Sequence, residues 1–469
     1  MSTSSNGGGS VRLSRRELEV ARLVAEGLTN REIATRLFVS ERTVDGHLEH
    51  VREKLSVNTR AQVATWVTRH ADESPAAVAV PAPPAARPAA LRRISKRWWV
   101  TASAVALVIV EAVVVLQVVV APRGPLVITV AGVDPDPTGF PVFRYTGDGG
   151  LATHAAMALP SDIAIAPDGF YVADYRNQVI RFVDRTTRRI KTYAGAGGLP
   201  LESGKVAISV DLGFASSVAV DRQGRLYFLT DENQDLQVWT VDSGGLVQRV
   251  TQLAPSGNEP LGFFPDPVGG LAIASDGTIY IGDRGRNQIW KYVPGSDPRL
   301  FAGSGRYGYS GDSGPAASAM LDSPTGLALD EKRGYLYFAD TGNNCIRRIS
   351  LAGDVISRFA GTCQSFGDAG DGGRALDARL SIPFGVAVGG DGTVFIADTG
   401  NYRLREVEPG GIILALAGTG QGVFFGDGVA ASQASFRAPT ALEIDRVTGD
   451  LFVVDTVSQC VRALIGVSR

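Results

Sequence analysis

Residues 98–121 most constrain how this chain can fold. They read WWVTASAVALVIVEAVVVLQVVVA and contain one ionisable side chain, Glu111. A bilayer core of about 30 Å needs about 20 apolar residues in a helix, so the stretch predicts one transmembrane helix. A segment with the pattern of a folded domain precedes it, which argues against a cleaved signal peptide. The alternative is that the stretch is a buried element of a larger domain.

Basic residues gather on one side of this stretch. Those that precede it are Arg87, Arg92, Arg93, Lys96 and Arg97, whereas Arg123 follows it. By the positive-inside rule the N-terminus is cytoplasmic and the C-terminal part lies outside, in a single-pass protein of the cytoplasmic membrane. Glu111 is expected to be either a protonated carboxyl with little role or a hydrogen-bonding group in a helix dimer.

Net charge and cysteine content also differ between the parts of the chain before and after residues 98–121. Residues 1–97 contain 16 Lys and Arg against 10 Asp and Glu, and the rest of the chain contains 30 against 38. The basic part suits a polyanionic partner. All three cysteines follow the predicted span, where disulfides persist. Cys345 and Cys363 flank one hairpin and are predicted to pair, whereas Cys460 is predicted to be buried and free.

Residues 11–70 show the apolar period of short helices. A first helix ends near Gly27, a second begins at Thr29 or Asn30, and a fourth covers residues 60–69. The third carries an apolar stripe at helical spacing, formed by Val44, Leu48, Val51 and Leu55. Four short helices, the third amphipathic over its whole length, predict an all-α helix-turn-helix domain.

This segment resembles a LuxR-type DNA-binding domain over its whole length. The matching residues are Glu17, Gly27, Asn30, Ile33, Ala34, Leu37, Ser40, Thr43, Val44, His47, Lys54, Leu55 and Arg60. The resemblance implies that the domain binds double-stranded DNA. It also implies that the fourth helix, around residues 61–67, forms a homodimer on a two-fold DNA site.

The residues expected to meet DNA lie on the face of the third helix opposite its apolar stripe. That face carries Arg42, Asp45, Gly46, Glu49 and Arg52. The resemblance implies base reading at Asp45, Gly46 and Glu49, where many members have lysines. A carboxylate accepts a hydrogen bond from cytosine N4 but is repelled by phosphates. Contacts to the phosphate backbone are predicted from Arg42, Thr43 and Lys54 and from the amides at the N-terminus of the second helix, at Asn30 and Arg31.

Residues 71–97, first Ala/Pro-rich and then basic, are predicted to be a linker. After the predicted span, residues 125–469 repeat one sequence phrase. It is an apolar strand ending in Asp, a polar turn and a second strand. The aspartates are Asp174, Asp231, Asp283, Asp340, Asp398 and Asp455. With strands before and after each phrase, six such repeats predict an all-β six-bladed β-propeller. The phrase resembles the NHL repeat.

The ends of this region predict how the propeller closes. The last repeat stops after its third strand, CVRALIG, and residues 126–132, LVITVAG, match the outer strand of the other repeats. We therefore expect the first strand after the span to complete the sixth blade. Such closure leaves no open edge.

Two polar features recur in the propeller. The repeat aspartates are predicted to accept backbone N–H bonds and so to cap turns. A Gly-Asp-Gly or Gly-Asp-Ser phrase precedes blades 1, 4, 5 and 6 and predicts tight turns, with a divalent cation at Asp368 and Asp371 as the alternative. Blades 2 and 3 lack it, and Phe263 and Phe264 between them are predicted either to contact a ligand or to be core.

These features predict a membrane-anchored, one-component transcriptional regulator whose propeller senses a ligand or protein outside the cell. The propeller has one histidine, His154, and no G-x-S-x-G nucleophile motif, so no catalysis, cofactor or metal is expected. One alternative is an exported adhesion or scaffold propeller whose inner domain no longer binds DNA, because of Asp45 and Glu49. The other is a membrane-tethered propeller enzyme.

Overall fold

The chain forms two compact units, Met1–Leu107 and Val108–Arg469. The computed structural model describes residues 15–25, 28–30, 33, 44, 48–49, 51–52, 54–55, 57, 59–69, 124–133, 145–232, 235–253 and 269–467. The predicted linker and the predicted span at 98–121 lie outside these residues. Within the described ranges, no helix has both the length and the apolar character needed to cross a membrane.

The first unit contains two described helices, α1 (Arg15–Ala25) and α4 (Arg60–Arg69), which pack against each other. They lie where the sequence predicts the first and fourth helices. The second and third predicted helices fall mostly outside the described residues. The four-helix domain as a whole therefore stays a prediction.

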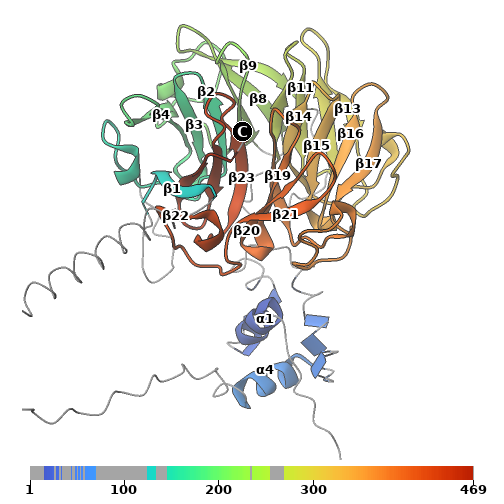
Figure 1. The fold of residues 1–469 in the computed structure, drawn as a ribbon. Helices are drawn as coiled ribbons and strands as arrows, with labels where there is room; N and C mark the ends of the chain where they lie inside the picture. Colours follow the sequence, from blue (N-terminus) through green and yellow to red (C-terminus); the bar gives the residue numbers. More distant parts are fainter. Residues whose placement is uncertain are drawn as a thin grey trace, which may run out of the picture. The chain divides into compact units, whose positions relative to one another are not determined.

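The second unit is a six-bladed β-propeller, as predicted (Figure 1). Each blade is an antiparallel sheet whose first strand lies innermost. Blade 1 comprises β2 (Asp162–Ala166), β3 (Gly169–Asp174), β4 (Val179–Asp184) and β5 (Ile190–Gly195). Blade 2 comprises β6 (Ala215–Val220), β7 (Leu226–Glu232), β8 (Asp235–Val241) and β9 (Val247–Gln252). Blade 3 comprises β10 (Leu271–Ile273), β11 (Ile279–Asp283), β12 (Gln288–Tyr292) and β13 (Arg299–Ala302).

The remaining blades repeat the pattern. Blade 4 comprises β14 (Pro324–Asp330), β15 (Tyr335–Asp340), β16 (Cys345–Ser350) and β17 (Val355–Ala360). Blade 5 comprises β18 (Pro383–Val388), β19 (Val394–Asp398), β20 (Arg403–Val407) and β21 (Ile413–Ala417). Blade 6 comprises β23 (Pro439–Ile444), β24 (Leu451–Asp455), β25 (Cys460–Ile465), β1 (Leu126–Ala131) and the short β22 (Val429–Ala430).

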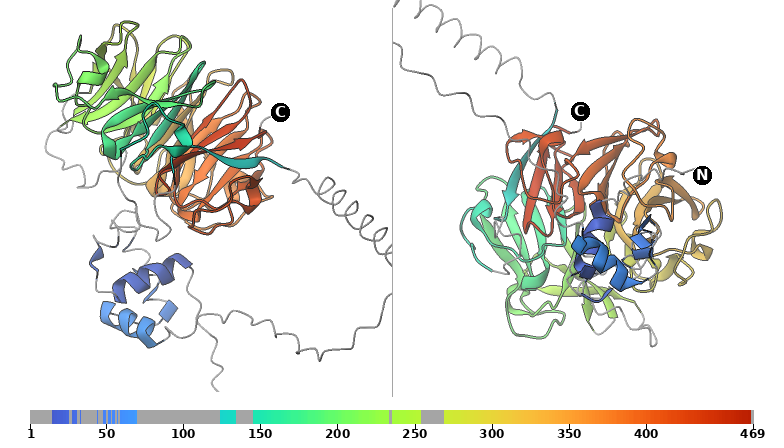
Figure 2. Two further views of the ribbon diagram at one scale, coloured as in Figure 1. Left: turned by 90° about the vertical axis from the view of Figure 1, so that its left-hand side faces the viewer. Right: turned by 90° about the horizontal axis from the view of Figure 1, so that it is seen from below.

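The predicted closure of the ring is confirmed. Strand β1 pairs antiparallel with β25, with Val127 opposite Leu464, and its other edge pairs with β22. Figure 2 shows the first strand of the propeller lying against its last blade. The two ends of the propeller sequence are thus held in one sheet, and no radial edge stays unpaired at the junction.

The core of the propeller lies between neighbouring blades. Between blades 1 and 2, for example, Tyr171 and Phe182 pack in one buried cluster with Phe228 and Trp239. The Gly-Asp turns that connect the blades are also closely packed. Gly311 has φ +88°, and a Cβ there would lie 2.7 Å from the Cα of Ala319. The Gly-Asp turns before Ala-rich segments are therefore structural, as predicted.

Candidate functional site

The apolar stripe of the third predicted helix is buried where the structure describes it. Val44, Leu48 and Val51 are each fully buried, and Leu55 is partly buried. Among the predicted DNA-contacting residues, Glu49 and Lys54 are exposed and Arg52 is partly exposed. The other predicted contacts on this segment, Arg31, Arg42, Thr43, Asp45 and Gly46, lie outside the described residues.

Asn30 has an internal partner that the sequence did not reveal. The Arg60 guanidinium at the start of α4 donates to the Asn30 side-chain oxygen and to the carbonyl of Leu28. The Asn30 side chain thus links two segments of the domain, whereas the predicted phosphate contact at this helix start concerns the backbone amides and stays a prediction. Thr59 and Gln62 begin α4 with reciprocal bonds, since each backbone N–H donates to the other side chain. This T-x-x-Q capping box is a sequence signal for a helix start.

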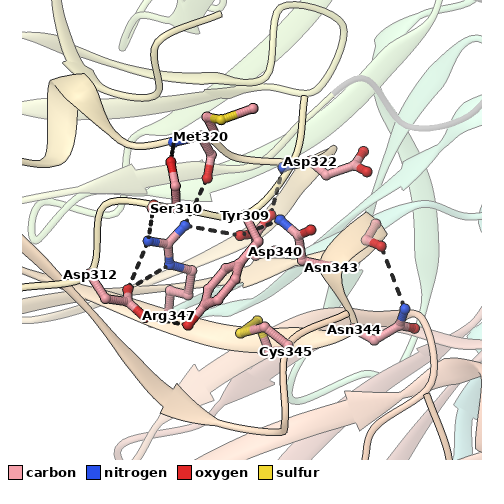
Figure 3. The surroundings of a disulfide bond; sticks show 12 residues. Tyr309, Ser310, Asp312, Met320, Asp322, Asp340, Asn343, Asn344, Cys345 and Arg347 are labelled. Carbon is pink, nitrogen blue, oxygen red and sulfur yellow. Dashed lines mark hydrogen bonds and ion pairs between the residues drawn. A yellow bond between two sulfur atoms is a disulfide. The ribbon is translucent and has the colours of Figure 1, made fainter. Parts of the chain in front are cut away.

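The propeller contains a recurrent buried arginine, drawn for blade 4 in Figure 3. Arg347 on β16 is fully buried and donates to Asp312 of the Gly-Asp turn at 2.8 Å and to Asp340 at the end of β15 at 3.3 Å. Its Nη1 and Nη2 atoms also donate to the carbonyls of Met320 and Ser310, each at 2.9 Å. The guanidinium therefore ties two strands to the connection that enters the blade.

The same arrangement recurs in blades 1, 5 and 6. The arginine lies seven residues after the repeat aspartate and bonds to the aspartate of the Gly-Asp turn. The pairs are Arg181 with Asp148 at 2.7 Å, Arg405 with Asp371 at 2.6 Å and Arg462 with Asp427 at 3.2 Å. Val238 and Trp290 occupy the arginine position in blades 2 and 3, which also lack the Gly-Asp phrase. The arginine and the Gly-Asp turn thus occur as one structural unit.

The repeat aspartates accept backbone N–H bonds, as predicted. In blade 3 the donor lies in the adjoining turn, since Asp283 accepts the N–H of Arg286 at 2.9 Å, but in blades 4 and 5 it lies elsewhere. The Asp340 carboxylate accepts the N–H of Asp322 at 2.7 Å, and Asp398 accepts that of Ser381 at 2.7 Å. Each donor lies in the connection that leads into the inner strand. Burial raises the pKa of both carboxyls above the usual range, and the neighbouring arginine acts in the opposite direction. Asp340 and Asp398 therefore hold the entering connection against the second strand of the same blade.

The structure also describes the predicted disulfide and the alternative cation site of the propeller. Cys345 and Cys363 form a disulfide beside the Arg347 cluster (Figure 3). Cys460 is buried and takes part in no disulfide. Asp371, the alternative cation ligand, is bound by Arg405 and lies 3.8 Å from Arg403. No cluster of three or more potential metal-ligating side chains occurs in the parts of the chain that the structure describes. Phe263 and Phe264 lie outside those parts.

A cavity of about 510 Å³ runs along the propeller axis. All six inner strands line it, namely β2, β6, β10, β14, β18 and β23. Small apolar side chains form most of the wall that these strands contribute, and two carboxylates on the strands, Asp162 and Glu443, interrupt them. Its volume is in the range of pockets for small molecules. His154 is exposed on a connection and does not line this cavity.

Comparison with known proteins supports the two-part organisation. Residues 11–67 match the family of bacterial regulatory proteins, luxR family. Over 294 residues the chain is 25% identical to NHL repeat-containing protein 2 of Bos taurus, an overlap of 55% of this chain and 40% of that protein. Over 195 residues it is 30% identical to Protein SUPPRESSOR OF QUENCHING 1, chloroplastic, of Arabidopsis thaliana, which covers 39% of this chain and 18% of that protein. The chain thus spans less than half the length of either relative.

Solved structures share the propeller fold. An auxiliary nutrient binding protein from Bacteroides ovatus superposes with a TM-score of 0.53 over 73% of this chain and 76% of that one. The two sequences are 17% identical over this overlap. At this identity the similarity shows the fold alone.

Proposed function

We propose that this chain is a DNA-binding transcriptional regulator whose propeller senses a ligand or a protein partner. The match of residues 11–67 to the luxR family of bacterial regulatory proteins carries the proposal. The burial of Val44, Leu48 and Val51 supports it, because the same predicted helix presents Glu49 and Lys54 to solvent on another face. A homodimer on a two-fold site would double these contacts. The regulatory match and the NHL relatives favour a regulator over an enzyme.

The proposal includes a single membrane span at residues 98–121, with the propeller outside the cell. The apolar length of this stretch and its basic N-terminal flank support it. The Cys345–Cys363 disulfide supports it independently, because disulfides persist mainly in oxidising compartments. Alkylation of free thiols in intact cells tests this placement. Cys345 and Cys363 should be protected as a disulfide, and finding both reduced would place the propeller in the reducing cytoplasm.

DNA binding is tested by crosslinking and capture of genomic fragments with the full-length protein, followed by titration of a recovered fragment. Binding should weaken steeply with salt, because phosphate contacts release counterions. The change Lys54→Ala should weaken binding to all fragments alike and lower the slope of log affinity against log salt by about 1. Arg22→Ala, which removes an exposed charge from α1, is the matched control and should leave that slope unchanged. Capture no better than from an untagged strain would refute DNA binding.

A further inference from the structure

One position of the inner strand is alanine in five blades and glutamate in the sixth. In every blade this residue lies opposite a Tyr or Phe of the second strand. The alanine pairs are Ala164–Tyr171, Ala219–Tyr227, Ala272–Tyr280, Ala328–Tyr337 and Ala387–Phe395. In blade 6 the pair is Glu443–Phe452. The register therefore places one carboxylate in a ring of alanines around the propeller axis.

Glu443 lines the central cavity and has no hydrogen bond or ion pair among the residues that the structure describes. Burial raises the pKa of its carboxyl to about 7, with Arg446 acting against the shift and Asp162 and Asp445 adding to it. An ionised carboxylate in such a place is costly unless a partner compensates it. Alanine at this position would avoid that cost, so a compensating partner from outside the chain would explain the glutamate.

The other carboxylates around the cavity already have partners. Asp162 accepts bonds from the Ser217 hydroxyl and from the N–H of Val218. At the rim, Arg185 pairs with Asp445 and Arg222 pairs with Glu331 at 3.3 Å. These bonds join neighbouring or next-neighbouring blades and are structural. Glu443 is thus the cavity carboxylate left to meet a ligand.

A second set of polar groups lies further along the same cavity. Ser161 and Ser216 occupy its wall at equivalent positions of blades 1 and 2, and they are 5% and 1% exposed. Their hydroxyl oxygens have no partner among the described residues. The equivalent residue of blade 6 is Thr440, three residues before Glu443, so this level lies about 10 Å along the axis from the glutamate. A buried hydroxyl without a partner is itself unfavourable.

We propose that the central cavity binds a small aliphatic amine, with its ammonium group on Glu443, its carbon chain against the alanine ring, and a polar end toward Ser161 and Ser216. This inference rests on the proposal that the propeller is the sensing part of the chain, and it names the site and the ligand class. Charge selects the class. Among the carboxylates that line the cavity, Glu443 is the one without a partner in the described residues, and a carboxylate attracts a cation but gives a neutral ligand no ion pair.

The test is calorimetric titration of the full-length protein at pH 8 with 1,5-diaminopentane. The diamine should bind, whereas 1,5-pentanediol and glutarate, which have the same length with no charge or negative charge, should not. Glu443→Gln should weaken diamine binding at least tenfold. Glu443→Ala, which restores the residue of the other five blades, should weaken diamine binding to a similar extent. Agreement between the two variants would show that the loss of binding does not come from a folding defect of one of them.

Glu406→Gln is the matched control, because Glu406 lies on β20, is partly buried and does not line the cavity. It should bind the diamine as the native protein does. The inference is overturned if the diamine does not bind, if the diol binds as well, or if both Glu443 variants retain full affinity. DNA capture is measured separately. Loss of DNA binding with intact diamine binding would refute the regulator and leave the cavity site standing.

Discussion

Replacing Arg347 with methionine should lower the stability of the propeller by about 3–5 kcal/mol, the usual cost of breaking a buried ion pair from one side. Methionine fills similar volume but leaves Asp340 and Asp312 without the guanidinium, and it orphans the carbonyls of Met320 and Ser310. For a domain of this size the loss corresponds to a fall in melting temperature of about 5 °C. Thermal unfolding of the full-length protein measures it.

The loss at Arg347 should depend on pH in a definite direction. Burial already raises the pKa of Asp340, and removing Arg347 removes a group that lowers it. In the variant, folded Asp340 therefore holds its proton to higher pH than unfolded Asp340 does. Stability contributed by such a group is present at low pH and is lost as the pH rises through the folded pKa. The destabilisation by Arg347→Met should thus be smaller at pH 5 than at pH 8.

Arg374→Met is the matched control for Arg347→Met. Arg374 lies 3.7 Å from Asp377, and both side chains are about two-thirds exposed or more, at 71% and 68%. Exposed ion pairs contribute about 0–1 kcal/mol, so this variant should melt close to the native protein at both pH values. Equal losses for the two variants would show that the recurrent arginines do not fasten the blades.

The blades could be predicted from the sequence because each repeat carries its own local signals. Strand period, turn residues and the spacing of the aspartates all recur, and the match of residues 126–132 to an outer strand indicated the closure that β1 and β25 make. Such patterns depend on residues close in sequence. They can therefore be recognised in the sequence without knowledge of the fold.

The polar clusters could not be predicted, because their partners are distant in sequence. Arg347 and Asp312 are 35 residues apart, and the signal that links them, an arginine seven residues after the repeat aspartate in each blade with a Gly-Asp turn, is visible only when the repeats are compared with one another. The bond between the Asn30 side chain and Arg60 likewise spans 30 residues. Glu443 was overlooked for the same reason. Its position matters only once the strand register shows alanine at the same place in the other five blades.

Loss of the Cys345–Cys363 disulfide should cost the propeller about 3 kcal/mol, since it closes a loop across 18 residues and its removal restores the entropy of that loop to the unfolded chain. The double variant Cys345→Ala, Cys363→Ala should melt about 4 °C below the native protein. A reducing agent should lower the melting temperature of the native protein by a similar amount and leave the double variant unchanged.

Cys460→Ala separates the cross-link from the loss of a buried thiol, because Cys460 is buried, forms no disulfide and lies at the position equivalent to Cys345. This variant should melt within about 2 °C of the native protein, since a small buried side chain is lost but no loop is opened. It should also keep its full sensitivity to the reducing agent. If reduction left the native melting temperature unchanged, the disulfide would contribute nothing to stability.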